Sequence, residues 1–163
     1  MENEPGQELN EFWDVARHYA FFDGFDFMRS RPWYTSMAPP AWSFGDTPQI
    51  ANELLALVLA RKKTATSSLL SEYGDADPLP KANDLSIILD GYGHPGALIR
   101  DDEVCVIPFA DVTAEQAAAE GEGDCSLAYW RAAHLAFWQR QGITVDDSAM
   151  VVHERFTLLY PKA

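Results

Sequence analysis

Between residues 85 and 109, three short apolar runs alternate with turn residues, and this pattern constrains the fold more than any other feature. The runs are Leu85 to Leu89, Gly96 to Arg100 and Glu103 to Phe109. Each run has the length and composition of a β-strand. Gly93-His94-Pro95-Gly96, with Asp90-Gly91 before it, supplies the first turn, and Asp101-Asp102 supplies a tighter one. Because such short connections join antiparallel neighbours, the region predicts a β-meander.

Helical patterns flank this meander on both sides. After a frayed tail of about seven residues, apolar residues recur at helical spacing from Leu9 to Ala20. A second helix begins at Thr47-Pro48, with Thr47 as its cap, and runs out near Arg61. A third runs from about Ser126 to Gln141 and is stopped by Gly142. With a long final strand predicted over Met150 to Tyr160, the sequence predicts an α+β fold with a small barrel or curled sheet.

The stretch from Ala20 to Pro40 is rich in aromatic residues and interrupted by glycine and proline. It therefore predicts an irregular, packed connection rather than one regular element. Aromatic side chains can also stack on nucleic-acid bases, although they more often belong to a core or a lid. We predict two parts: residues 1–41 form an N-terminal helix and aromatic connection packed on the domain, and residues 42–163 form the domain itself.

Length and composition predict a single domain in a protein that stays in the cytoplasm. The chain has 163 residues, 47% of them apolar, which is enough for one main core. No run approaches the roughly 20 apolar residues of a membrane-spanning helix, and the acidic start is unlike a signal peptide. We therefore predict a cytoplasmic protein without a membrane partner, whose two cysteines, Cys105 and Cys125, are buried free thiols.

The charge balance limits how the chain can bind nucleic acid. It carries 12 basic and 25 acidic residues, for a net charge of -13, so it lacks the basic surface that coats phosphate backbones nonspecifically. The only run of three bases is Arg61-Lys62-Lys63. This run is the obvious place for an anion, although three bases can also simply neutralise the C-terminal end of a helix.

The sequence lacks several of the common catalytic motifs. The four histidines lack the spacing of a zinc site, and the chain has no G-x-S-x-G, G-x-x-x-x-G-K-[ST] or G-x-G-x-x-G motif. We therefore predict no metal and no cofactor. Two segments remain as candidates for chemistry, Arg61 to Ser68 and Glu120-Gly121-Glu122-Gly123-Asp124.

Lysine, a hydroxyl and a carboxylate form a workable set for acyl transfer. The lysine tunes the hydroxyl proton, the hydroxyl attacks or positions water, and the carboxylate passes a proton to the leaving amine. Lys63, Thr66 and either Glu120 or Glu122 would fill these roles. The acidic segment can equally be a solvated turn before a capped helix, so the residues alone leave both interpretations open.

Several of these blocks together resemble the longer bacterial ASCH-domain proteins, over about residues 42 to 160. The matching blocks are Trp42 to Asp46, Ala51 to Ala60, Lys62 to Leu69, Leu79 to Lys81, Asp90-Gly91, Glu120 to Asp124, Ser126-Leu127 and Trp130-Arg131. The resemblance implies a PUA-like β-barrel with flanking helices and a cleft at the lysine motif. It also implies an association with RNA, since some members resemble ribonucleases and others are amidohydrolases that deacylate N4-acetylcytidine.

The resemblance also implies roles for individual residues. Lys63 matches the motif lysine, Thr66 the hydroxyl residue three places later, and Glu120 or Glu122 the acidic partner. The chain departs from the general signature at Arg61, where glycine is usual, and at Thr66 and Ser68, where many members have glutamate and arginine. These departures weaken the transfer of an RNA-binding role and fit the branch that uses threonine.

The function predicted on these grounds is a metal-independent hydrolase of a modified nucleoside that acts through Lys63, Thr66 and Glu120 or Glu122. The alternatives are an RNA-binding module without catalysis and a metal-independent ribonuclease, each with RNA as its partner in the same cleft. The residues predicted to contact the substrate are Arg61, Lys62, Thr64, Ser67, Phe44, Ser126 and Arg131.

Overall fold

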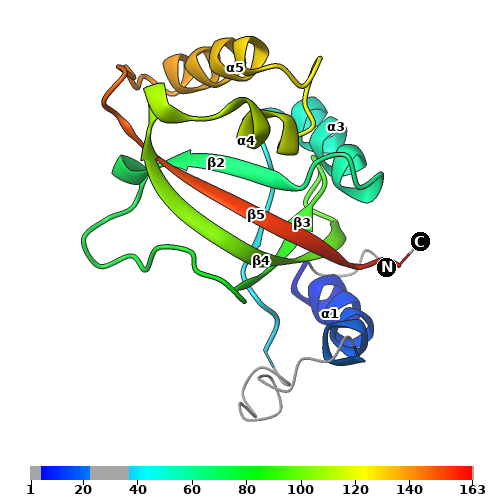
Figure 1. Cartoon of the computed structure of the whole chain (residues 1–163). Coiled ribbons are helices and arrows are strands. Elements are labelled where there is room, and N and C mark those ends of the chain that lie inside the picture. The colour runs from blue at the N-terminus through cyan, green and yellow to red at the C-terminus, as the bar shows by residue number, and fades with distance from the viewer. Residues whose placement is uncertain (1–4, 23–36, 163) are drawn as a thin grey trace. The chain divides into compact units, whose positions relative to one another are not determined.

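The computed structural model describes residues 5–22 and 37–162 (Figure 1). These residues fall into two compact units. The first unit comprises the N-terminal part of the chain to Leu59, residues 85–100 and the C-terminal end from Leu158. The second comprises residues 60–84 and 101–157. Both of the longest strands pass from one unit into the other, and each unit has a core of its own.

The first unit is built from two helices and short strands. Its elements are α1 (Pro5–Phe22), β1 (Ala41–Trp42), α3 (Pro48–Leu59), β3 (Leu85–Leu89) and the first part of β4 (Pro95–Pro108). As predicted, Thr47 caps α3, its Oγ1 accepting a hydrogen bond from the backbone N–H of Ile50 at 3.2 Å. Trp13 and Ala16 of α1 pack on Ile87 and Leu98 of the strands, so one stripe of the amphipathic helix closes this core.

The second unit holds the segments that sequence analysis singled out for chemistry. Its elements are β2 (Ala65–Leu69), η2 (Leu70–Glu72), η3 (Phe109–Asp111), α4 (Ala114–Ala119), α5 (Leu127–Arg140) and most of β5 (Met150–Tyr160). Figure 1 shows α4 and α5 on one side of β2 and β5. Ala117 of α4 and Trp130 and Trp138 of α5 pack there against Leu69 and Val151 and form the core of this unit.

The strands form one five-stranded mixed sheet in the order β1-β3-β4-β5-β2. β1 pairs with β3 in parallel, whereas β3 with β4 and β2 with β5 are antiparallel. The α+β class is therefore confirmed, as are the antiparallel pairing after the turn at residues 90–94 and the long final strand. Closure of this sheet into a barrel stays a prediction.

The tight turn expected at Asp101-Asp102 is wrong, because β4 runs without interruption from Pro95 to Pro108. Two acidic residues in sequence normally indicate a turn, since their side chains prefer water. Here Asp101 is only 5% exposed, and its carboxyl group hydrogen-bonds that of Glu154 on β5. Its backbone N–H also donates to the carbonyl of Asp84 at 2.9 Å, so tertiary contacts keep the strand continuous where the local sequence favours a turn.

Other boundaries also differ from the expectation. Helix α1 begins at Pro5, within the segment predicted to be frayed, which fits the preference for proline in the first helical turn. Helix α4 was not predicted, although Thr113 and Gln116 form a capping box at its start. Cys125 is exposed and Cys105 partly so, so the two free thiols are not buried. Most of the aromatic connection, residues 23–36, lies outside the described residues.

Within residues 5–22 and 37–162, no helix has both the length and the apolar character needed to cross a bilayer.

Candidate functional site

The two predicted segments of the second unit are joined through their backbones. The N–H of Thr64 donates to the carbonyl of Ala119 at 2.8 Å, and the Thr64 Oγ1 donates to the same oxygen at 3.0 Å. On the other side, the N–H of Phe156 donates to the carbonyl of Thr64 at 2.9 Å. These bonds fix the loop after α3 between β5 and the end of α4, and so they position the side chain of Lys63.

Lys63 lies between the two glutamates of the acidic segment. Its Nζ donates to Glu122 Oε1 at 2.6 Å and lies 3.7 Å from Glu120 Oε2. The side chains of Lys63 and Glu120 are each 1% exposed, whereas that of Glu122 is 21% exposed. The predicted set of Lys63, Glu120 and Glu122 is thus brought together, as a buried ion pair with a third charge at its edge.

Glu120 is the centre of this group. Its Oε1 accepts hydrogen bonds from the hydroxyl of Ser67 and from Trp130 Nε1, the latter at 2.7 Å, and its Oε2 lies 3.3 Å from His134 Nε2. Burial alone would raise the pKa of Glu120, but the Lys63 charge, His134 and the Ser67 hydroxyl outweigh burial and lower that pKa to about 2. Glu120 is therefore an ionised carboxylate at neutral pH. We call Lys63, Ser67, Glu120, Glu122, Trp130 and His134 the Lys63 cluster.

Two histidines contact Glu120 in different ways. His134 Nδ1 lies 2.8 Å from the carbonyl of Trp130, and its Nε2 lies 3.3 Å from Glu120 Oε2. His153 is 1% exposed; its Nε2 lies 3.4 Å from the carbonyl of Gln116 and 4.0 Å from Glu120 Oε1. Burial lowers the pKa of His153 and so keeps its ring neutral, and the contact with a carbonyl places the single proton on Nε2.

The two predicted hydroxyl residues of β2 lie on opposite faces of the strand. Ser67 pairs with His153 of β5 and contacts Glu120, whereas Thr66 pairs with Glu154. Successive side chains of a strand alternate between faces, so Thr66 belongs with Ser68, whose hydroxyl lies 2.9 Å from that of Tyr73. Burial, followed by the charges of Asp84 and Asp102, raises the pKa of Asp101 to about 7 against the lowering effect of its hydrogen bond with Glu154. Burial and the neighbouring Asp101 raise the pKa of Glu154 to about 8, so this second face holds a shared proton at neutral pH.

The remaining predicted contact residues are spread over several elements. Arg61 and Lys62 are exposed beside the Lys63 cluster, and Thr64 serves the backbone contact with Ala119. Ser126 caps α5 by accepting from the N–H of Tyr129, and Arg131 donates to the carbonyl of Ala110 at 3.0 Å. Phe44 lies in the first unit, where it is buried and its ring meets Trp42 edge-on at 4.8 Å.

Sequence reasoning missed Trp130, His134 and His153 as members of the site. Trp130 and His134 are four residues apart on α5, so they share one face of that helix, and their rings stack at 4.3 Å. That spacing was visible in the sequence, but nothing local showed that the face would meet Glu120. Within the described part of the chain, no group of three histidine, cysteine, aspartate or glutamate side chains is placed to hold a metal ion.

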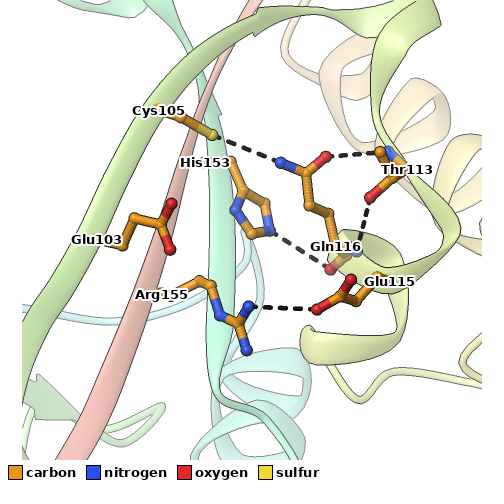
Figure 2. Close-up of a pocket in the computed structure, with 7 residues that line it drawn as sticks. All are labelled: Glu103, Cys105, Thr113, Glu115, Gln116, His153 and Arg155. Carbon is orange, nitrogen blue, oxygen red and sulfur yellow. Dashed lines mark hydrogen bonds and ion pairs between the residues drawn. The ribbon is translucent and has the colours of Figure 1, made fainter.

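A hollow of about 200 Å³ borders this site (Figure 2). It lies between the second half of β4, the start of α4 and β5, and it is lined by Glu103, Cys105, Thr113, Glu115, Gln116, His153 and Arg155. Gln116 is occupied by its capping contact with Thr113 and by a contact of 3.5 Å with Cys105 Sγ. Because His153 forms part of the wall and also lies near Glu120, the hollow and the Lys63 cluster are neighbours.

Gly121 allows the close approach of the two segments, and we expect its replacement by alanine to be strongly destabilising. It adopts a φ of +69°, and a Cβ there would lie 2.1 Å from the carbonyl oxygen of Lys62. Backbone would have to move, so we expect Gly121→Ala to lower the free energy of unfolding by at least about 3 kcal/mol, measured by urea denaturation. Gly142→Ala is the matched control, because Gly142 has a φ of +77° with open space around it. An equal loss in both variants would show that φ alone, and not the contact with Lys62, sets the effect.

Comparisons with known proteins identify the family of the chain. A family model for the ASCH domain matches residues 40–160. The structure is similar to that of protein EF3133 from Enterococcus faecalis V583, with 29% identity, a TM-score of 0.76, and coverage of 93% of this chain and 88% of the other. It is also similar to an ASCH domain from Lactobacillus crispatus JV V101, with 25% identity, a TM-score of 0.76, and coverage of 98% and 96%. No protein with a curated description matches the chain. Since the family model spans most of the sequence and includes both segments of the site, the chain belongs to the ASCH domain family.

Proposed function

We propose that this ASCH protein is a hydrolase that cleaves the amide bond of an acylated nucleoside such as N4-acetylcytidine. One observation carries the proposal: the buried ammonium of Lys63, the ionised carboxylate of Glu120 and the hydroxyl of Ser67 lie together. Amine, carboxylate and hydroxyl are the groups that acyl transfer requires.

The chemistry follows from the charges. A hydroxyl of β2 attacks the acyl carbon, or holds a water molecule that does so, and gives its proton to Glu120, which is ionised and faces Ser67. The carbon–nitrogen bond breaks and the amine nitrogen takes up the proton from Glu120. Where the hydroxyl itself attacks, water then cleaves the acyl ester, which restores the hydroxyl and supplies the second oxygen of the released carboxylic acid; where water attacks directly, that water supplies the oxygen. Lys63 balances the charge of Glu120 throughout, and Glu122, which is partly exposed, connects the group to solvent.

The overall charge favours a neutral substrate. At a net charge of -13, the chain repels long RNA except where basic residues gather, whereas an uncharged nucleoside experiences little repulsion. The exposed bases beside the Lys63 cluster are Arg61 and Lys62. They are the residues on which a noncatalytic RNA-binding role, or a ribonuclease, would depend.

The test is turnover of N4-acetylcytidine by the wild type, Thr66→Ala and Ser67→Ala, with a short single-stranded RNA assayed in parallel. Because the two side chains are on opposite faces of β2, only one supplies the reacting hydroxyl. We expect its removal to lower kcat/KM by about 10² or more, and the other substitution to change it by less than about tenfold. Ser68→Ala is the control, since the Ser68 hydroxyl faces Tyr73.

Release of cytidine by the wild type, lost in one of the two variants, supports the amidohydrolase. If the wild type cleaves the RNA instead, the amidohydrolase proposal is wrong and the protein is a ribonuclease. If the wild type releases nothing from either substrate and yet binds RNA, the protein is a binding module.

A further inference from the structure

The charged centre of the Lys63 cluster is closed to a substrate in the structure. The side chains of Lys63 and Glu120 are each 1% exposed, and Lys63 Nζ donates to Glu122 Oε1 at 2.6 Å. Acyl transfer needs a substrate to lie beside these groups, so at least one group that covers them has to move. The two carboxylates next to Lys63 are those of Glu120 and Glu122.

Of these two carboxylates, only that of Glu122 is loosely held. The side chains around Glu120 come from three parts of the chain and are those of Lys63, Ser67, Trp130 and His134. For the carboxylate of Glu122, the described residues provide one partner, Lys63, and its side chain is 21% exposed. Glu122 can therefore exchange its partner for water, whereas Glu120 would lose several buried contacts at once.

The backbone on both sides of Glu122 is tightly packed, so any movement is one of the side chain. A Cβ on Gly121 would lie 2.1 Å from the carbonyl oxygen of Lys62. A Cβ on Gly123, which has a φ of +57°, would lie 2.4 Å from the ring of Tyr129. Rotation of the Glu122 side chain about its own bonds takes its carboxylate towards solvent and leaves both contacts in place.

We infer that Glu122 is a gate over the Lys63 cluster. Its carboxylate swings out to solvent when a substrate enters, and its Oε1 marks the position that the acyl oxygen of the substrate then takes. An acyl oxygen accepts from an ammonium as a carboxylate oxygen does, so Lys63 keeps a partner when the gate opens. The inference rests on the proposed function, because it states how the same site admits its substrate. Glu120 then takes the proton, whereas Glu122 competes with the substrate for Lys63.

A gate of this kind links two quantities that are measured separately. The apparent affinity for a substrate is reduced by the fraction of molecules whose gate is open. If about one molecule in ten is open, removing the gate makes Lys63 about ten times more accessible and lowers KM by the same factor. A residue with a purely structural role would not lower KM when it is removed.

Chemical labelling of Lys63 tests the gate without any turnover. The full chain is treated with the acetyl ester of N-hydroxysuccinimide, and mass spectrometry of peptides gives the labelling rate of Lys63 relative to that of the exposed Lys62. We expect Glu122→Ala to raise this ratio about tenfold, and Glu122→Gln, which keeps the length of the side chain, to raise it less. Glu115→Ala, at an exposed glutamate of α4, is the matched control and should label as the wild type does.

Hydrogen exchange distinguishes a gate from a loosened loop, which would also expose Lys63. The N–H of Thr64, next to Lys63, donates to the carbonyl of Ala119 at 2.8 Å. We expect this N–H to exchange at the wild-type rate in Glu122→Ala while the labelling of Lys63 rises. If the N–H of Thr64 exchanges faster by the same factor as the labelling, the loop itself has opened and the inference is wrong.

Acetate tests the position assigned to the acyl oxygen. Glu122→Ala removes the carboxylate from beside Lys63, so a small carboxylate can take its place. We expect sodium acetate to slow the labelling of Lys63 in Glu122→Ala and to leave the wild type unchanged, with sodium chloride at equal ionic strength as the control. If acetate and chloride act alike on the variant, the position of Glu122 Oε1 is not that of an acyl oxygen.

The outcomes separate this inference from the proposed function. Equal labelling of Lys63 in Glu122→Ala and in the wild type would overturn the gate. Turnover of N4-acetylcytidine with a KM that Glu122→Ala does not lower would also overturn the gate, and would leave the hydrolase standing. Labelling and protection by acetate as expected, without release of cytidine by the wild type, would support the gate and overturn the hydrolase.

Discussion

Replacing Lys63 by methionine is expected to lower the free energy of unfolding by about 3 to 5 kcal/mol, the usual cost of breaking a buried ion pair by removing one partner. Lys63 and Glu120 are each 1% exposed, so the substitution leaves the buried Glu120 carboxylate without its cation. Equilibrium denaturation with urea measures the loss, and circular dichroism shows how much fold remains. Any loss of turnover in this variant therefore has to be corrected for unfolding.

Two further variants identify the cause. Lys62→Met removes the neighbouring exposed charge and should change stability by less than about 0.5 kcal/mol. The double variant Lys63→Met with Glu120→Gln removes the stranded charge as well and should recover part of the loss. If Lys63→Met were as stable as Lys62→Met, Lys63 would not stabilise the loop, and the burial of its ion pair would be in doubt.

Stability should also fall as the pH rises from about 5 to 9, because of Asp101 and Glu154. Burial, with the charges of Asp84 and Asp102 for Asp101 and of Asp101 for Glu154, raises the pKa values of these carboxyl groups to about 7 and about 8, above the values of about 4 that they have in the unfolded chain. The native state therefore holds a proton that the unfolded state has released, and the slope of stability against pH is negative over this interval. For one shared proton we expect a decrease of roughly 3 to 4 kcal/mol.

Glu154→Gln keeps the shape of the side chain, removes one ionisable group and should flatten this pH dependence. Asp75→Asn, at an exposed acidic residue, is the control and should keep the slope of the wild type. His153 and Glu120 have lowered pKa values, so their contribution to stability decreases as the pH falls, in the opposite sense. Both are present in the variant and in the wild type. The difference between the two pH profiles of unfolding free energy therefore reports on Asp101 and Glu154. A Glu154→Gln variant with the same pH profile as the wild type would contradict the shared proton.

Much of the site was predictable because its parts lie in local motifs. The cap at Thr47 and the end predicted near Arg61 located the helix that precedes Lys63, and Lys63 lies between α3 and β2. The acidic segment was singled out by its residues, whereas the contact of Gly121 with the backbone of Lys62 appears only in the structure. Only the pairing of the two segments, through Thr64 and Ala119, required contacts 55 residues apart in sequence.

The sequence by itself determined the α+β class, the main helices, the final strand and the lysine and glutamates that meet, because capping, periodicity and turn chemistry act over a few residues. Tertiary structure alone decided which hydroxyl of β2 faces Glu120, since a shift of one residue exchanges the faces of a strand. It also brought His134 and His153 to the same carboxylate and kept β4 continuous through Asp101, because burial can make an acidic residue hold its proton. Those outcomes depend on burial and on long-range partners, which no local pattern encodes.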